Sequence, residues 1–341
     1  MLGWPFKRLN YTRFMIGTSK KQMEYIPPGD IGDNALTRFS LDPAPEALVQ
    51  SIRELGITHP VLLAPQDTHY PIVCGHRRIE CARLLELDTV PAFVLDATPP
   101  SSESLKLNLT ENLGQREYSD IEKGRVVHQL AAAGVPEAEI IKDCLPLLDL
   151  ERSKKLCVDL NRCAVFSENL NTLLHRLKVP LRVFSILFRW DEAGREAAET
   201  LLDTLRPGVN KCRELLELID ETAVKENTSP HEILNRKEIQ TPLKHAGLPV
   251  NEQYDAVQKQ LRLWRYPVLT DLQKQVYKAI DQLKLDGRIK LRTPENFESD
   301  QFKIELNFSS REELTAQVEQ LFRVTDSEAL DELIRIFRDM Q

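Results

Sequence analysis

The chain has 341 residues, of which 42% are hydrophobic and 28% charged, and its formal net charge is −7 at pH 7. This length supports two or three globular domains with cores of their own, while the acidic balance excludes a surface that is basic throughout and confines any nucleic-acid contact to a local patch. No apolar run approaches the roughly 18 residues that a membrane-spanning helix needs, and the first residues lack the apolar core of a signal peptide, so we expect a cytoplasmic protein that contacts no membrane.

The first 118 residues divide into an arm and a small α/β domain. Residues 1–24 are basic with scattered aromatic residues and no strong period, which predicts an unordered arm or, as the alternative, an arm that touches nucleic acid. From residue 25 to residue 118 short apolar runs alternate with amphipathic stretches, as strands and helices do in an α/β domain. The predicted helices are 46–55, 76–85 and 102–113, and the predicted strands are 60–63, 71–73 and 90–95.

One turn of this domain has the features of a binding site. An apolar strand runs into Gly75, and Arg77 and Arg78 follow at the start of the next helix. A helix start offers unpaired amide groups and the positive end of a dipole, glycine lets the backbone approach a ligand, and arginine donates in a fork that fits phosphate oxygens. The turn therefore predicts an anion cradle. A solvated surface is the alternative, although cations at a helix start oppose the dipole.

Residues 119–240 are predicted to be almost wholly helical. Gly134 and Pro136 separate one helix, at 121–133, from the next, at 137–144. Glycine and proline interrupt helices at such positions because the first frees the backbone and the second lacks an amide hydrogen. The segment is therefore expected to form a domain of short, tightly connected helices.

A basic helix follows within this segment. Pro146 is expected to end the preceding helix, and Asp149 is the predicted cap of the next one, at 150–163. The cations among its polar positions are Arg152, Lys154, Lys155 and Arg162. Short helices with tight turns and one basic helix favour a helix-turn-helix arrangement that binds DNA. An ordinary helical bundle with a solvated basic face is the alternative.

The last segment, residues 241–341, comes after a long charged helix at 210–226 and begins at a seam rich in proline and glycine. The predicted elements are amphipathic helices at 252–264 and 269–285, strands at 288–292 and 302–308, and a helix that begins near Ser309. Two strands form too small a sheet to cover both flanking helices, which favours association with a second copy of the chain.

Three blocks of the α/β domain carry a family resemblance. They are Leu36-Thr-Arg-Phe39, the turn Gly75-His-Arg-Arg78, and Glu111-Asn112 on a helix whose apolar face includes Leu105 and Leu109. In order and spacing they resemble the amino-terminal domain of the ParB family, the chromosome and plasmid partition proteins that bind CTP. The resemblance implies an α+β multidomain protein: a small α/β domain of the ParB/sulfiredoxin fold (25–118), a helical domain of the helix-turn-helix type (119–240) and a small α/β carboxy-terminal dimerisation domain (241–341).

The resemblance also implies which residues form the sites. Those at the nucleotide are Arg38, Gly75, His76, Arg77, Arg78, Glu111, Asn112 and Arg116, of which Glu111 and Asn112 would also hold Mg²⁺ through oxygen atoms. Those at DNA are Arg152, Lys154, Lys155 and Arg162 of the basic helix. Leu36 and His76 stand where the family has residues linked to CTP hydrolysis. Leucine cannot orient a water molecule, so CTP binding is expected while hydrolysis is doubtful.

The implied function is that of a DNA-binding partition-type protein at the bacterial nucleoid, which binds CTP as a dimeric clamp and has DNA, a second copy of itself and a partition ATPase as partners. An accessory or regulatory ParB-like protein, which binds nucleotide without loading on a partition site, is the alternative. A sulfiredoxin-like enzyme is a remote alternative, because Cys74 precedes the glycine of the turn instead of following it. A nuclease would need clustered acids to hold a metal, and the sequence shows no convincing cluster beyond Glu111. The six cysteines have no Cys-x-x-Cys spacing, so neither a cysteine metal site nor a disulfide framework is predicted.

Overall fold

The computed structural model describes residues 23–66, 69–112, 117–294 and 301–338. The chain is a mixed α/β protein with a helical majority, and it divides into two compact units, one ending at Leu216 and the other beginning at Glu217. Within the described ranges no helix combines the length and the apolar character needed to cross a membrane. Most of the predicted arm, residues 1–22, lies outside these ranges. Met23 and Glu24 belong to a strand, which corrects the arm's boundary.

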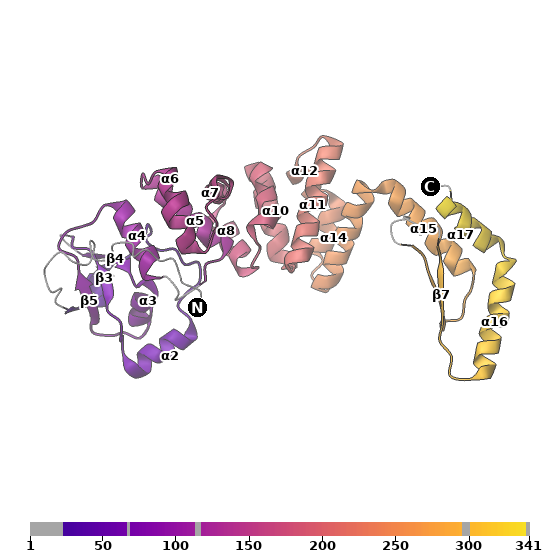
Figure 1. Ribbon diagram of the computed structural model, residues 1–341, viewed down its shortest axis with the longest axis horizontal. Coiled ribbons are helices and arrows are strands. Elements are labelled where there is room, and N and C mark those ends of the chain that lie inside the picture. Colours follow the sequence, from indigo (N-terminus) through magenta and orange to yellow (C-terminus); the bar gives the residue numbers. More distant parts are fainter. Residues whose placement is uncertain (1–22, 67–68, 113–116, 295–300, 339–341) are drawn as a thin grey trace, which may run out of the picture. The chain divides into compact units, whose positions relative to one another are not determined.

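The amino-terminal part of the first unit contains a five-stranded mixed sheet (Figure 1). Its strands are β1 (Met23–Ile26), β2 (Ile31–Gly32), β3 (Val61–Leu63), β4 (Tyr70–Cys74) and β5 (Val90–Val94), in the order β1-β5-β3-β4-β2. Strand β3 runs parallel to β5 and antiparallel to β4. The three predicted strands are confirmed as β3, β4 and β5. Strands β1 and β2 were not predicted, because both are short and lie at the edges, where the burial that produces a clear pattern is weak.

Three helices accompany the sheet: α2 (Glu46–Leu55), α3 (His76–Leu84) and α4 (Ser101–Glu111), close to their predicted bounds. Ile72 packs in the same core as Ile79 of α3, whereas Val73 packs with Leu107 of α4. Since neighbouring residues of a strand point to opposite faces, α3 and α4 cover opposite faces of β4. The start of α3 and the end of α4 are thereby brought together at the carboxyl end of β4.

Short helices make up the rest of the first unit. In chain order they are α5 (Asp120–Ala132), α6 (Glu137–Glu139), the π-helix η2 (Ile140–Cys144), the 3-10 helix η3 (Leu145–Leu148), α7 (Lys154–Asn161), the 3-10 helix η4 (Arg162–Val165), α8 (Glu168–Arg176), α9 (Leu181–Phe184), the 3-10 helix η5 (Ser185–Arg189) and α10 (Glu192–Leu205). Their core includes Val126, Leu130, Leu145 and Leu160, all buried.

Two details of the predicted basic helix are wrong. It begins at Lys154 instead of residue 150, and its cap is Ser153, whose hydroxyl accepts from the amide of Leu156. Asp149 instead adopts a left-handed conformation with φ of 56° and ends η3. The preceding helix, α6 continued by η2, ends at Cys144 as predicted. Pro146 lies just beyond it, in the first turn of η3, where its missing amide hydrogen is not needed.

The second unit begins within α11 (Val209–Glu226). Its further elements are α12 (Pro230–Leu234), α13 (Lys237–Lys244), α14 (Val250–Arg265), α15 (Pro267–Gln282), β6 (Ile289–Arg292), β7 (Lys303–Leu306), α16 (Arg311–Thr325) and α17 (Glu328–Arg338). The predicted helices and strands of this segment are confirmed, but part of the expected seam is helix α13, and α17 was not predicted. Val276 of α15 is buried with Leu333 and Phe337 of α17.

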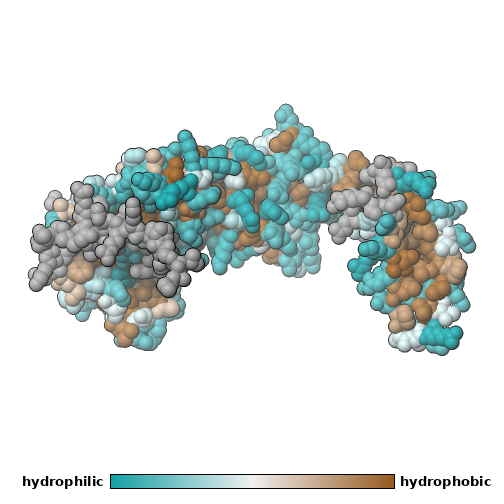
Figure 2. Space-filling model, viewed as in Figure 1, coloured by the Kyte–Doolittle hydropathy of each residue, from teal (hydrophilic) through white to brown (hydrophobic). Residues whose placement is uncertain are grey.

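Apolar side chains are also exposed on the carboxy-terminal segment. Figure 2 shows brown, hydrophobic residues gathered on the visible face of this part of the chain. The exposed ones include Ile304, Phe308, Val318 and Phe322, and Phe322 keeps 71% of its surface accessible. A contiguous apolar surface of this kind is typical of an interface with another chain.

Candidate functional site

A cavity of about 470 Å³ lies at the start of α3, within the size range of small-molecule sites. It is lined by the described residues that the sequence analysis assigned to a nucleotide: Arg38, Gly75, His76, Arg77, Arg78, Glu111 and Asn112. The eighth, Arg116, lies outside the described residues. Three segments far apart in sequence thus contribute to one pocket.

Gly75 lines this cavity with its backbone. Its φ of 104° is one that residues with a side chain rarely adopt, and a Cβ atom added there would lie 2.7 Å from Cγ1 of Val61. Among the described residues no side chain caps α3, so the first amides of the helix remain for a ligand. The backbone at Gly75 is therefore both close to β3 and open towards the cavity.

Replacing Gly75 by alanine should lower the free energy of unfolding by about 1–3 kcal/mol, because the new Cβ combines a strained φ with a contact against β3. Gly29→Ala is the matched control, since a Cβ at Gly29 meets no atom within 4 Å. Thermal and denaturant unfolding of both variants would measure the difference. Equal stability of the two variants would contradict the strained geometry.

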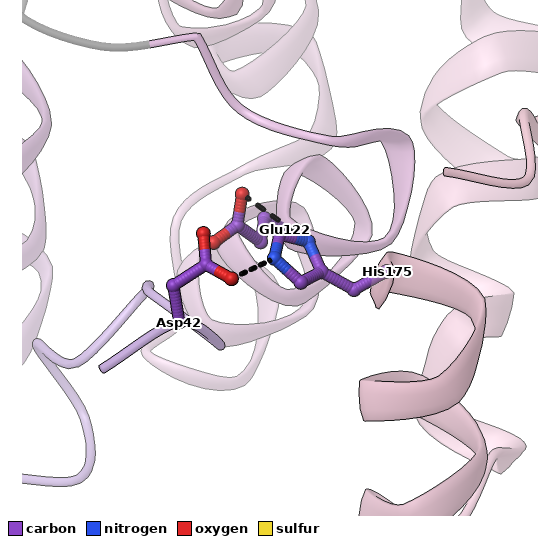
Figure 3. A group of neighbouring side chains, drawn as sticks. All are labelled: Asp42, Glu122 and His175. Atoms are coloured by element: carbon purple, nitrogen blue, oxygen red, sulfur yellow. Dashed lines mark hydrogen bonds and ion pairs between the residues drawn. The ribbon is translucent and has the colours of Figure 1, made fainter. Parts of the chain in front are cut away.

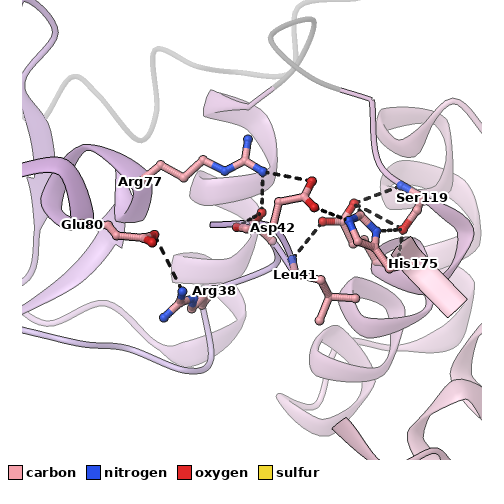
Figure 4. Close-up of polar contacts among 9 residues, drawn as sticks. Arg38, Leu41, Asp42, Arg77, Glu80, Ser119 and His175 are labelled. Carbon is pink, nitrogen blue, oxygen red and sulfur yellow. Dashed lines mark hydrogen bonds and ion pairs between the residues drawn. The ribbon is translucent and has the colours of Figure 1, made fainter. Parts of the chain in front are cut away.

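Each arginine of the cavity faces a carboxylate. Arg78 lies 2.6 Å from Glu111, and its Nη1 also donates to the carbonyl oxygens of His59 and Pro60, at 2.8 and 2.9 Å. This guanidinium is therefore fixed between β3 and α4. The remaining two pairs are looser (Figure 4), with Arg77–Asp42 at 3.6 Å and Arg38–Glu80 at 3.8 Å.

The two looser arginines are the better candidates for a phosphate. Their carboxylate partners, Asp42 and Glu80, are 56% and 38% exposed, and ion pairs this exposed contribute little to stability. Arg77 also donates to the hydroxyl of Ser40 at 2.6 Å. An anion can replace these contacts at small cost, whereas moving Arg78 would strand two backbone carbonyls and a half-buried carboxylate.

His76 is held as a neutral imidazole. Burial, with the nearby Arg38 charge, lowers its pKa to about 4. The hydroxyl of Thr37 donates to the carbonyl of Ile72 at 2.7 Å, so His76 Nε2 must be the donor in its 2.9 Å contact with Thr37. In this arrangement His76 has used its hydrogen within the protein and offers a ligand only the lone pair of Nδ1. It does not provide a cation for a phosphate.

Asn108 is a site residue that the sequence analysis missed. Its buried amide donates to the carbonyls of Thr37 and Val73, at 2.9 and 2.6 Å. These bonds join β4 and α4 to the loop of residues 33–45, which carries Arg38 and is called the arginine loop below. Asn112 donates in turn to Asn108 Oδ1 at 2.7 Å. The only sequence signal was a polar residue on the apolar face of α4, beside Leu109.

Glu111 and Asn112 present oxygen atoms suited to a hard cation. The amide nitrogen of Asn112 is committed to Asn108, which leaves Oδ1 as its ligand atom, and the Glu111 carboxylate is 32% exposed. Mg²⁺ at nucleotide sites takes one or two protein oxygens and completes its shell with phosphates and water. The two residues fit such an ion.

Asp42, Glu122 and His175 form a second polar cluster beside the cavity (Figure 3). Glu122 is buried, and its two oxygens accept from the backbone amides of Leu41 and Ser119, both at 3.0 Å. The Ser119 hydroxyl contacts His175 Nδ1 at 2.7 Å. Because protein donors already surround the carboxylate, the cluster is a hydrogen-bonded junction between the arginine loop and helices α5 and α8, and its geometry does not favour a metal ion.

The predicted DNA residues are not equivalent. Lys154 and Lys155 are exposed on α7. Arg152 donates through Nε to the carbonyl of Lys142 at 3.0 Å. Arg162 donates to the carbonyl of Phe188 and lies 4.7 Å above the ring of the same residue. Both arginines therefore hold neighbouring turns in place, and the lysines are the cations of this helix most accessible to a phosphate backbone.

Comparison with known proteins identifies the first domain. The model of the ParB N-terminal domain matches residues 17–113, which contain the cavity's three segments. These residues are therefore similar to the ParB N-terminal domain. The match covers less than a third of the chain, so it bears on the ParB domain and not on the helices and strands that follow.

Curated relatives match over the same region. The chromosome-partitioning protein Spo0J of Thermus thermophilus is 38% identical over 95 residues, 28% of this chain and 35% of that protein. A probable plasmid-partitioning protein ParB of the same species is 40% identical over 78 residues, covering 23% and 26%. The nucleoid occlusion protein of Bacillus licheniformis is 30% identical over 118 residues, covering 33% and 41%. The shared segment thus spans well under half of each of these relatives.

Two solved structures of Caulobacter crescentus ParB were also found. The complex with CTP-gamma-S is 20% identical, covers 46% of this chain and 85% of that chain, and has a TM-score of 0.24. The complex with the centromeric parS site is 15% identical, covers 57% and 98%, and has a TM-score of 0.32. At these scores neither likeness supports an argument about the ParB domain or its ligands.

Proposed function

We propose that the ParB domain binds a nucleoside triphosphate with Mg²⁺, and that the nucleotide is CTP, as in the family. The observation that carries the proposal is one cavity at an uncapped helix start that gathers arginines, a glycine turn and a carboxylate-amide pair. Arg38 and Arg77 would contact phosphate oxygens, and Gly75 would let the backbone approach them. Glu111 and Asn112 would hold the cation, which neutralises phosphate charge when bound.

Binding without hydrolysis is the expected behaviour. Leu36 packs against the hydrophobic core that includes Phe39, so it presents no polar group to a water molecule. His76 donates its only N–H to Thr37. The groups that neutralise phosphate charge are therefore present, while those suited to positioning an attacking water are not.

Isothermal titration of the full chain with each of the four nucleoside triphosphates tests the proposal. CTP with Mg²⁺ should bind most tightly, and chelation of the metal should weaken binding. If none of the four nucleotides releases or absorbs heat on titration, the nucleotide site is refuted. Tight binding of a purine nucleotide in preference to CTP would keep the site but contradict the assignment of CTP.

We further propose that the whole chain acts as a DNA-binding, partition-type protein, a dimeric clamp at the bacterial nucleoid. The exposed lysines of α7 and the apolar surface of the carboxy-terminal segment support contacts with DNA and with a second copy. A partition ATPase remains an expected partner from the family. The accessory alternative, which binds nucleotide without DNA, differs from this proposal in one measurable property.

That property is DNA binding, and its salt dependence tests which residues contact the DNA. If α7 contacts the backbone, Lys154→Ala with Lys155→Ala should flatten the log–log slope of affinity against salt by up to about two units, because each neutralised phosphate contributes roughly −0.9. Lys237→Ala with Lys244→Ala, on exposed positions of α13, is the charge-matched control. An unchanged slope would remove α7 from the interface. Absence of binding at low salt would favour the accessory function.

A further inference from the structure

Asp42 connects the candidate nucleotide cavity to helix α8. Its Oδ2 lies 3.6 Å from Arg77 Nη2, and its Oδ1 lies 2.8 Å from His175 Nε2 (Figure 4). A carboxylate can only accept, so His175 Nε2 carries a hydrogen and donates it to Asp42. One carboxylate is thus shared between an arginine of the cavity and a histidine of the neighbouring helices, and the histidine has the shorter contact.

His175 is well placed to hold Asp42 in this position. Its side chain is only 13% exposed, and the opposite ring nitrogen lies 2.7 Å from the hydroxyl of Ser119 and 3.8 Å from the Glu122 carboxylate. Ser119 caps α5 and Glu122 completes that capping box, so these contacts rest on a fixed helix start. The ring cannot rotate without breaking a contact on each side.

We infer that the Asp42 carboxylate competes with the phosphates of the nucleotide for Arg77. His175 weakens this competition, because its hydrogen bond draws the carboxylate away from the arginine. The inference rests on the proposed nucleotide site and concerns its regulation. A triphosphate carries more charge than one carboxylate and takes Arg77 from Asp42, after which His175 is the remaining partner of Asp42. Occupation of the cavity therefore tightens the attachment of α8 to the arginine loop, and firmer attachment of α8 favours occupation, as thermodynamic reciprocity requires.

The competition predicts opposite effects of two substitutions. Asp42→Asn keeps an oxygen that can accept from His175 but removes the charge, so affinity for CTP with Mg²⁺ should rise about three- to tenfold. His175→Ala frees Asp42 to pair with Arg77, so affinity should fall several-fold. In the double variant the effect of His175→Ala should vanish, because no competing charge remains.

Three controls separate this role from a structural one. His175→Gln can still donate to Asp42 and should restore nearly the wild-type affinity. Asp203→Asn makes the same charge change at an exposed residue that pairs with Arg176 of α8, away from the cavity, and should leave affinity unchanged. Thermal unfolding of each variant shows whether the fold is kept, and if His175→Ala does not fold, the Asp42→Asn and His175→Gln measurements still decide the inference.

Inorganic tripolyphosphate serves as a second titrant, because the competition concerns the anion alone. If wild-type protein binds CTP but Asp42→Asn binds it no tighter, the inference is overturned and the nucleotide site stands. If the wild type binds no nucleotide while Asp42→Asn gains affinity for tripolyphosphate, the competition stands and the proposed function fails. If His175→Ala lowers affinity equally in the wild-type and Asp42→Asn backgrounds, His175 is a structural residue. If no variant binds either titrant, both the competition and the nucleotide site are overturned.

Discussion

Replacing Arg77 by alanine should weaken CTP binding roughly 10- to 100-fold, since a hydrogen bond between charged groups is worth about 1.5–3 kcal/mol. The side chain lines the cavity, and its contacts with Ser40 and Asp42 can be exchanged for a phosphate. The fold should be little affected, because the pair with Asp42 is partly exposed and loose. Isothermal titration and thermal unfolding would measure the two quantities separately.

Two further arginines make this experiment specific. Arg53→Ala removes an exposed arginine of α2 whose side chain, within the described residues, hydrogen-bonds to Gln50 alone. This substitution should change neither the affinity for CTP nor the stability. Arg78→Ala should lower both the affinity for CTP and the free energy of unfolding, the latter by about 1–3 kcal/mol. It leaves the carbonyls of His59 and Pro60 without their donor and the Glu111 carboxylate without its ion-pair partner. Wild-type affinity in Arg77→Ala protein would exclude this arginine from the site.

The sequence was sufficient where local chemistry determines structure. The turn at Gly75 was predicted because an apolar strand precedes the glycine and a helix that begins with arginines follows it, and the φ of 104° observed there suits glycine. Helices α2, α3 and α4 were predicted from apolar positions that repeat with the helical period. The cavity residues were then brought together by the family resemblance, since periodicity alone does not say that Arg38 and Glu111 share a pocket.

Contacts between distant residues could not be predicted. Asp42 and His175 are 133 positions apart, and no local pattern marks either of them. Whether a histidine on an amphipathic helix faces solvent or a carboxylate depends on how α8 packs against α5. The start of α7 was missed because Asp149 and Ser153 are both suitable caps. Asp149 ends η3 in a left-handed conformation, and Ser153 caps α7.

The carboxy-terminal segment should hold two copies of the chain together. Its two-stranded sheet, β6 and β7, is too small to cover the flanking helices, and an isolated hairpin is at best marginally stable. Phe308 and Phe322 are 54% and 71% exposed there. Burial of each large aromatic side chain is worth about 1.5–3 kcal/mol, so we expect their surface to be covered by a second copy.

Truncation at Thr241 should therefore convert the protein from a dimer to a monomer in light scattering. Phe322→Asp in the full chain is the sharper test, because it places a charge on the exposed apolar surface of α16 without touching the buried core of Phe337 and Leu333. Val224→Asp, at a residue of α11 that is 77% exposed, is the matched control and should remain dimeric. Because a charge buried at an interface without a partner costs several kcal/mol, Phe322→Asp should raise the dissociation constant by at least about 100-fold. A Phe322→Asp protein that stays dimeric together with a truncated chain that also stays dimeric would place the interface before residue 241.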